Sequence, residues 1–164
     1  MAAYNLIATT TVGSGGSSSI EFSSIPQTYT DLKVVMSLRS SSTGNQILIS
    51  LNGSTSSFTN LYFTGDGSNP ATGTLARYSG VSTYSTETAN VFSNGEIYLP
   101  NYTSSTNKAF GCDAVAENNA TTTYMAMISG LWSNTAAITS LTLTCNAGSW
   151  VQYSSASLYG IKNS

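Results

Sequence analysis

Histidine is absent from the 164 residues of this chain. Without it, the sequence lacks the commonest general base and the usual partner of a nucleophilic serine or cysteine. Most hydrolase triads are therefore excluded. Two carboxylates could still hydrolyse a glycoside, but each acidic residue stands alone, in a turn or at a polar strand position. We therefore expect no enzymatic activity and predict no catalytic residue.

Charge of either sign is also scarce, with 7 acidic and 5 basic residues and a net charge of -2. The basic residues Lys33, Arg39, Arg77, Lys108 and Lys162 are scattered, so the sequence lacks the Lys/Arg clusters that bind nucleic acid. No apolar run is long enough to cross a bilayer, and the first residues do not resemble a secretory signal. We expect neither nucleic acid nor a membrane as a partner. A surface of serine, threonine, asparagine and glycine suits dense packing between copies.

Residues that could hold a metal or a cofactor are few. Cys112 and Cys145 each lie beside apolar residues on the same face of an expected strand, which predicts reduced core thiols; a disulfide between them stays open. Asp66 is the one acid in a glycine-rich stretch, whereas calcium loops need several oxygen ligands. The "VGSGGS" segment precedes a strand pattern rather than a helix, so it lacks the context of a phosphate loop. We predict no metal and no cofactor.

Helical periodicity is nearly absent, and strand alternation is widespread. About eleven segments alternate apolar and polar residues, for example residues 31–39, 46–52 and 73–79, and turns rich in glycine, serine and asparagine separate them. The inward positions of these segments form the predicted core: Ile7, Ile20, Phe22, Leu32, Val34, Met36, Leu38, Ile47, Ile49, Leu51, Ile97, Leu99, Phe110, Met125, Met127, Leu141, Leu143 and Leu158.

Many short strands separated by turns are typical of an all-β, antiparallel β-sandwich. The connections after Ser23 and around residues 65–73 are longer than hairpin turns, and we expect both to cross between two sheets. That expectation favours a sandwich of jelly-roll type. The length fits a single domain over residues 1–164, with residues 1–16 as an N-terminal arm or first hairpin.

One strand, residues 122–132, is apolar on both faces. Met125, Met127 and Leu131 point one way and Tyr124, Ile128 and Trp132 the other. We assign the methionine face to the core. The second face is then covered either by the loop of residues 64–80 or by another subunit.

Tyrosine and tryptophan offer rigid apolar area with a polar group, which suits protein contact or sugar stacking. Several of them stand opposite the apolar face of their strand. The candidate interface residues are Tyr124, Ile128, Trp132, Tyr98, Trp150 and Tyr159.

Four stretches of the sequence carry a resemblance to known proteins: "YNLIATTTVGSGGSSSIEFSSIPQTYTDLKVVMSLRSS", "GEIYLPNYTSSTNKAF", "AENNATTTYMAMISGLWSNTAAITSLTL" and "VQYSSASLYGIKNS". Together they resemble small β-rich virion proteins of tailed bacteriophages, many of them aquatic. The likeness covers nearly the whole chain, but it consists of strands and turns rather than a catalytic motif. Members are described as tail-fibre or capsid-associated structural proteins, and no functional residue carries over.

The resemblance implies a structural protein of the virion, assembled in the host cytoplasm. The leading hypothesis is a capsid decoration, or cement, protein that binds and stabilises the outer surface of the head. Its expected partners are further copies of itself, as a homotrimer, and the major capsid protein or other virion proteins. Residues 2–12 and the strands that bear tyrosine and tryptophan are the expected contact elements. The alternative is a tail-fibre or spike module that recognises a host surface glycan.

Overall fold

The structure, a computed structural model, describes residues 3–118 and 122–162. These residues form twelve β-strands and no helix, and therefore no helix that could cross a membrane. All pairs of named strands are antiparallel. The predicted all-β, antiparallel class is confirmed.

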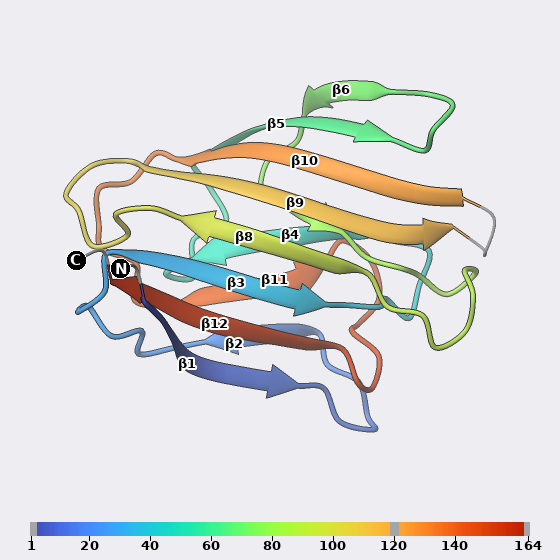
Figure 1. Cartoon of the computed structure of the whole chain (residues 1–164), viewed down its shortest axis with the longest axis horizontal. Helices are drawn as coiled ribbons and strands as arrows, with labels where there is room; N and C mark the ends of the chain where they lie inside the picture. Colours follow the sequence, from blue (N-terminus) through green and yellow to red (C-terminus); the bar gives the residue numbers. More distant parts are fainter. Residues whose placement is uncertain (1–2, 119–121, 163–164) are drawn as a thin grey trace.

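The strands form two sheets of unequal width, and Figure 1 looks onto the wider one, with β2, β4 and β11 behind it. The eight-stranded sheet contains, in spatial order, β1 (Ala3–Thr11), β12 (Ser155–Lys162), β3 (Asp31–Ser37), β8 (Asn94–Leu99), β9 (Lys108–Asn118), β10 (Thr122–Trp132), β5 (Phe58–Gly65) and β6 (Ala71–Thr74). The four-stranded sheet contains β2 (Ser19–Phe22), β11 (Leu141–Cys145), β4 (Gln46–Leu51) and β7 (Tyr78–Val81).

The core lies between the two sheets and contains most of the predicted residues. The inward positions of β3, β4, β8 and β11, such as Val34, Ile49, Ile97 and Leu143, are fully buried, as their alternation predicted. Ile7, on the edge strand β1, is only half-buried and packs against this core.

Two residues of the predicted core are misplaced. Met125 and Met127 point away from the core, and Met127 is 55% exposed. The opposite face of β10 is buried instead, with Trp132 only 1% exposed. The assignment of the two faces of this strand was therefore wrong.

One of the two expected crossings between sheets is confirmed. The segment after Ser23 leads from β2 in the small sheet to β3 in the large one. The segment of residues 65–73 instead closes the hairpin between β5 and β6 within one sheet. The Asp66 carboxylate accepts hydrogen bonds from the Ser68 and Asn69 amides, both at 2.8 Å, a turn that the aspartate side chain itself stabilises.

The crossing in this region comes later, and it divides the expected strand of residues 73–79. β6 ends at Thr74, and β7 begins at Tyr78 in the other sheet. Between them Arg77 adopts a left-handed conformation with a φ of 64°. Its guanidinium Nε donates a 2.8 Å hydrogen bond to the carbonyl of Ile49 in β4, and this bond fixes the chain against its new sheet.

Both cysteines are free thiols, as predicted. Cys112 lies in the core, where burial raises the pKa of its thiol. Cys145 is half-buried at the end of β11. Residues 3–11 of the expected arm or first hairpin form β1, which pairs with β12 at the edge of the large sheet; residues 1 and 2 lie outside the described residues.

Candidate binding surface

The outer face of the eight-stranded sheet collects almost all the large apolar side chains that the described residues expose. The small sheet covers only the inner face. Tyr153, in the loop before β12, is the exception. We call this set the outer face: Tyr4, Leu6, Val35, Leu61, Phe63, Tyr98, Val115, Met125, Met127 and Leu131.

The outer face contains a hollow where small residues lie between large ones along one row of paired residues. The register aligns Tyr98 of β8 with Gly111 of β9, Gly111 with Ser129 of β10, and Ser129 with Leu61 of β5. The two central positions carry no side chain or a small one, and the flanking positions carry large ones. A glycine within a strand often marks a place where another molecule approaches the backbone closely.

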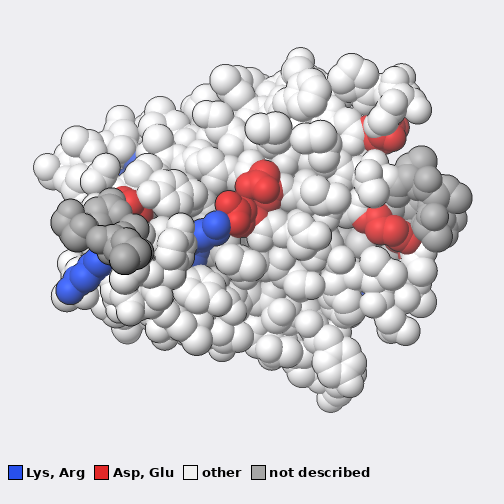
Figure 2. All heavy atoms as spheres, in the orientation of Figure 1, with Lys and Arg blue, Asp and Glu red and all other residues white. Residues whose placement is uncertain are grey.

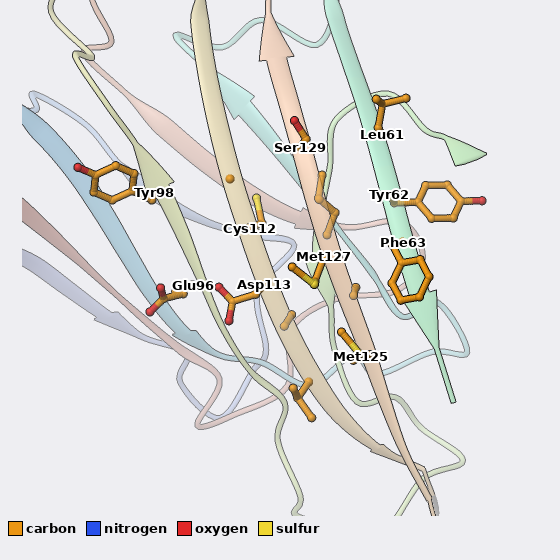
Figure 3. A pocket seen from close by; sticks show the side chains of 15 residues that line it. Leu61, Tyr62, Phe63, Glu96, Tyr98, Cys112, Asp113, Met125, Met127 and Ser129 are labelled. Atoms are coloured by element: carbon orange, nitrogen blue, oxygen red, sulfur yellow. The ribbon is translucent and has the colours of Figure 1, made fainter. Parts of the chain in front are cut away.

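The neighbouring row supplies one wall and the polar groups of the hollow. It aligns Glu96 with Asp113, Asp113 with Met127, and Met127 with Phe63. The hollow has a volume of about 810 Å³ and is lined mainly by apolar atoms, with residues of β5, β8, β9 and β10 around it. In Figure 3 the Glu96 and Asp113 carboxylates lie side by side at one end, and the Phe63 ring lies at the other.

The carboxylates share a single cation. Lys33 Nζ lies 2.5 Å from Glu96 Oε2, and this interaction raises the pKa of Lys33. Partial burial and the neighbouring charge of Glu96 raise the pKa of Asp113, although Lys33 opposes the shift. In the described part of the chain, Asp113 forms no hydrogen bond and no ion pair of its own. The hollow therefore carries two carboxylates and one cation beside apolar surface, and among the described residues the Asp113 carboxylate is the one of the two without a direct ion pair.

Tyr98 is held in place beside this pair. Its hydroxyl donates a 2.6 Å hydrogen bond to Asp31 Oδ2, and the amide of Asn101 donates to Asp31 Oδ1 at 2.8 Å. The hydrogen bond to Asp31, with some burial, raises the pKa of Tyr98 to about 12. The ring is thereby fixed at the edge of the hollow, and its face remains partly exposed.

The rest of the outer face is almost uncharged. In Figure 2, which shows this side of the molecule, one group of basic and acidic atoms lies near the middle within white surface, and the other charged atoms lie toward the left and right ends. Nowhere in residues 3–118 and 122–162 do three potential metal ligands of the His, Cys, Asp or Glu type gather. The arrangement presents apolar surface beside two carboxylates and one lysine.

The predicted interface residues are divided between this face and the core. Tyr98 is exposed on the outer face, and Tyr159 is half-buried on the same side of the sheet. Tyr124 is half-buried and packs against the core. Ile128, Trp132 and Trp150 are buried in the core, so the expectation that they form a surface is wrong.

Packing explains this reversal. The Trp132 ring stacks on Phe58, with ring centroids 6.1 Å apart. A Cβ on Gly130, which shares the Trp132 face, would lie 2.3 Å from the Phe110 ring. Glycine at this position thus makes room for a core aromatic, and it is the one sequence signal that marks this face of β10 as the packed one.

No single sequence signal indicates the remaining residues of the hollow. Leu61, Phe63, Met127 and Gly111 come from three strands, and only the pairing of these strands brings them together. Comparison of the chain with known proteins finds no protein family, no curated protein and no solved structure that matches it.

Proposed function

We propose that this protein is a non-enzymatic structural component of a tailed-phage virion, a decoration protein that binds the outer surface of the head. The observation that carries the proposal is the outer face, since a broad apolar patch on a folded chain commonly marks a contact with another protein. The placement in a virion derives from the resemblance of the sequence to small β-rich phage proteins.

The strand order supports a jelly-roll fold, an architecture common in viral capsid domains. When β5, β6, β9 and β10 are left out, the strand order is β1-β12-β3-β8 in the large sheet and β2-β11-β4-β7 in the small one. Two four-stranded sheets in this order, joined by two Greek keys, form a jelly roll. We propose that the two extra pairs are insertions that widen one sheet and thereby build the outer face.

The proposal includes association between copies, with a trimer as the expected form. Ile128 and Trp132 no longer support it, because both are buried. The support from the surface shifts to the edge strand β1, where Tyr4 and Leu6 are exposed and no other strand of the described residues pairs with the free edge. Unpaired edge strands with apolar side chains readily pair with another chain. Sedimentation of the purified protein, with Leu6→Lys as the disrupting variant, tests this part.

Purified particles provide the test of the whole proposal. A particle should contain on the order of hundreds of copies of a decoration protein, because the protein repeats with the symmetry of the shell. Quantitative mass spectrometry of intact phage measures that number. Absence from the particle would contradict the proposal, and a few tens of copies or fewer would favour a fibre.

Oxidative footprinting tests whether the outer face is the surface that binds. Met125 and Met127 are exposed, whereas Met36 is only 2% exposed and serves as an internal control. Hydrogen peroxide should oxidise the first two in the free protein and spare them in the particle. Equal oxidation in both states would show that another surface makes the contact.

A second candidate, recognition of a host glycan by a tail-fibre or spike module, is favoured by one observation. The exposed Tyr98 ring stands beside two carboxylates, and sugar sites combine an aromatic face with acceptors for hydroxyl groups. A glycan array with the wild type and with Tyr98→Ala tests it. Binding that depends on Tyr98, together with a low copy number, would favour this function.

A further inference from the structure

We propose that the hollow at Gly111 and Ser129 receives an arginine or lysine side chain from a different protein, whose apolar surface covers the surrounding outer face. The inference deepens the proposed function, on which it rests, by naming the chemistry of the partner. It is argued from the shape of the hollow, its charge and the cations that this chain can itself supply.

The shape leaves room for a long side chain within a wider apolar contact. Gly111 and Ser129 leave the floor open, and a Cβ built on Gly111 would meet nothing within 4 Å. Leu61, Tyr98 and Met127 form apolar walls around that floor. The methylene stem of an arginine or lysine can lie against such walls while its charged end reaches a polar group.

The charge calls for a cation. Glu96 and Asp113 are paired neighbours on adjacent strands, and Lys33 contacts Glu96 only. An apolar protein surface laid over the face would exclude water from Asp113, and burying an uncompensated carboxylate is costly. A partner that brings its own cation removes this cost, and a planar guanidinium can also stack on the Tyr98 ring.

A second copy of this chain can hardly supply that cation. The Arg39 guanidinium is buried and donates to the carbonyls of Glu87, Thr88 and Val91. Lys108 is buried and donates to two loop carbonyls, at 2.7 and 2.5 Å.

Arg77 is engaged as well, with Ile49 and Ser50 of β4, and Lys33 belongs to the face itself. Of the five basic residues, only Lys162 at the end of β12 remains exposed without such a contact. A second copy thus offers no arginine and one lysine, which the test below addresses through Lys162→Ala, and we expect the complementary charge on another protein.

Two capped pentapeptides test the inference, acetyl-Val-Ser-Arg-Ser-Val-amide and the same peptide with citrulline, a neutral isostere, in place of arginine. Each is titrated into the isotopically labelled full chain, and amide chemical shifts are followed by NMR. The arginine peptide should shift the amides of Gly111, Asp113 and Ser129. It should bind about 3- to 10-fold more tightly than the citrulline peptide, as a charge-assisted contact does.

Two variants and one control assign the binding to the hollow. Gly111→Val fills the floor in open space and suits a strand, so it should keep the fold and abolish binding. Asp113→Asn should remove the preference for arginine over citrulline. Glu21→Gln, an exposed position on the other sheet, is the matched control and should leave both affinities unchanged.

Equal affinity for the two peptides would overturn the inference, as would shifts that map to another surface or a neutral glycan that occupies the hollow when the arginine peptide does not. Self-association through this face, reversed by Lys162→Ala, would overturn it in favour of a second copy. Peptide binding by a protein that is absent from purified particles would refute the virion assignment alone. Presence in particles without peptide binding would refute the inference alone.

Discussion

At the scale of single residues, β10 places two large side chains, Trp132 and Met127, in opposite environments. Trp132 is 1% exposed, and Met127, on the other face of the strand, is 55% exposed. The first fills the core beside Phe58, whereas the second contributes to the outer face. The same kind of truncation should therefore have very different effects on stability.

Trp132→Ala should lower the free energy of unfolding by about 3–5 kcal/mol, because it removes a buried aromatic ring and leaves a cavity. Met127→Ala should change it by less than about 0.5 kcal/mol, as expected for an exposed site. Urea denaturation of both variants measures the two values. A larger loss for Met127→Ala than for Trp132→Ala would mean that the strand is turned the other way.

The ionisation of the Tyr98 hydroxyl should occur at an unusually high pH, and this can be observed directly. Its hydroxyl donates to Asp31 as a neutral group, and its pKa rises to about 12. The stabilisation is thus fully present below the pKa of an unfolded tyrosine, about 10, and is lost as the pH rises through about 12. Stability should fall between these values.

The difference in tyrosinate absorbance between the wild type and Tyr98→Phe should isolate this one ionisation. The same difference can be measured in the Asp31→Asn background, with and without Tyr98→Phe. There the pKa of Tyr98 should move back toward its ordinary value, because the charged acceptor carboxylate has been removed. A difference titration centred near pH 10 in the wild type would show that the hydrogen bond to Asp31 does not control Tyr98.

At the scale of elements, the segment of residues 82–93 between β7 and β8 forms no strand. Backbone hydrogen bonds hold its two ends, for example from Ser82 to Asn45 and from Ser93 to Leu38, and one side chain holds its middle. The buried Arg39 donates three hydrogen bonds to its carbonyls, at 2.7, 3.0 and 3.1 Å. Within the segment, the Glu87 carboxylate accepts from the Tyr84 amide at 2.8 Å. The guanidinium replaces the ladder hydrogen bonds that a strand would have supplied.

Arg39→Lys should cost about 2–4 kcal/mol, because one ammonium group cannot satisfy three separated carbonyls and some remain buried without a partner. Lys162→Met, an exposed change of charge, is the control. A glutamate-specific protease should cut after the buried Glu87 much faster in Arg39→Lys than in the wild type. Equal cleavage rates would mean that the segment is held by other contacts.

Elements were the part of this protein that the sequence predicted best. Alternation as in Leu32, Val34 and Met36 defines both a strand and its inner face, because the opposite face is mostly polar, with Lys33 and Ser37 beside Val35. β10 alternates two apolar faces, so periodicity locates the strand and cannot orient it. The orientation depends on the volume that remains after Phe110 and Phe58 are placed, a property of the paired strands and not of the segment.

Periodicity also could not predict the hollow. Gly111 could be recognised as a strand glycine, but its neighbours Tyr98 and Ser129 become neighbours only through the order β8-β9-β10. Strand order in antiparallel sheets depends on whether each connection is a hairpin or a crossing between sheets, and the length of a connection does not distinguish the two. The expected crossing at residues 65–73 illustrates this, because a nine-residue connection turned out to be a hairpin turn with flanking strand residues.

At the scale of the whole molecule, an apolar outer face stands on a protein whose net charge is only -2. With so small a net charge, copies of the protein repel one another only weakly. The polar character of the remaining surface comes mainly from hydroxyl and amide groups. The native state itself should therefore behave, in one respect, like a partly unfolded protein.

The folded protein should bind a hydrophobic fluorescent dye without any loss of structure, because the outer face is a contiguous apolar patch. Met127→Lys should lower the fluorescence by roughly half, since it places a charge in the middle of that patch. Tyr153→Lys, at an exposed site elsewhere, is the control and should have little effect. Equal losses in both variants would place the dye on another surface.

The empty position at Gly111 also has a consequence for natural variation. No substitution can enlarge the hollow there, because glycine already has the smallest side chain, and every other residue fills space that is open in the free protein. The fold tolerates such a change, and valine would even favour the strand. If an arginine or lysine does dock here, descendants of this gene will keep glycine at position 111 for as long as they keep the partner, and that position will begin to drift when the partner is lost.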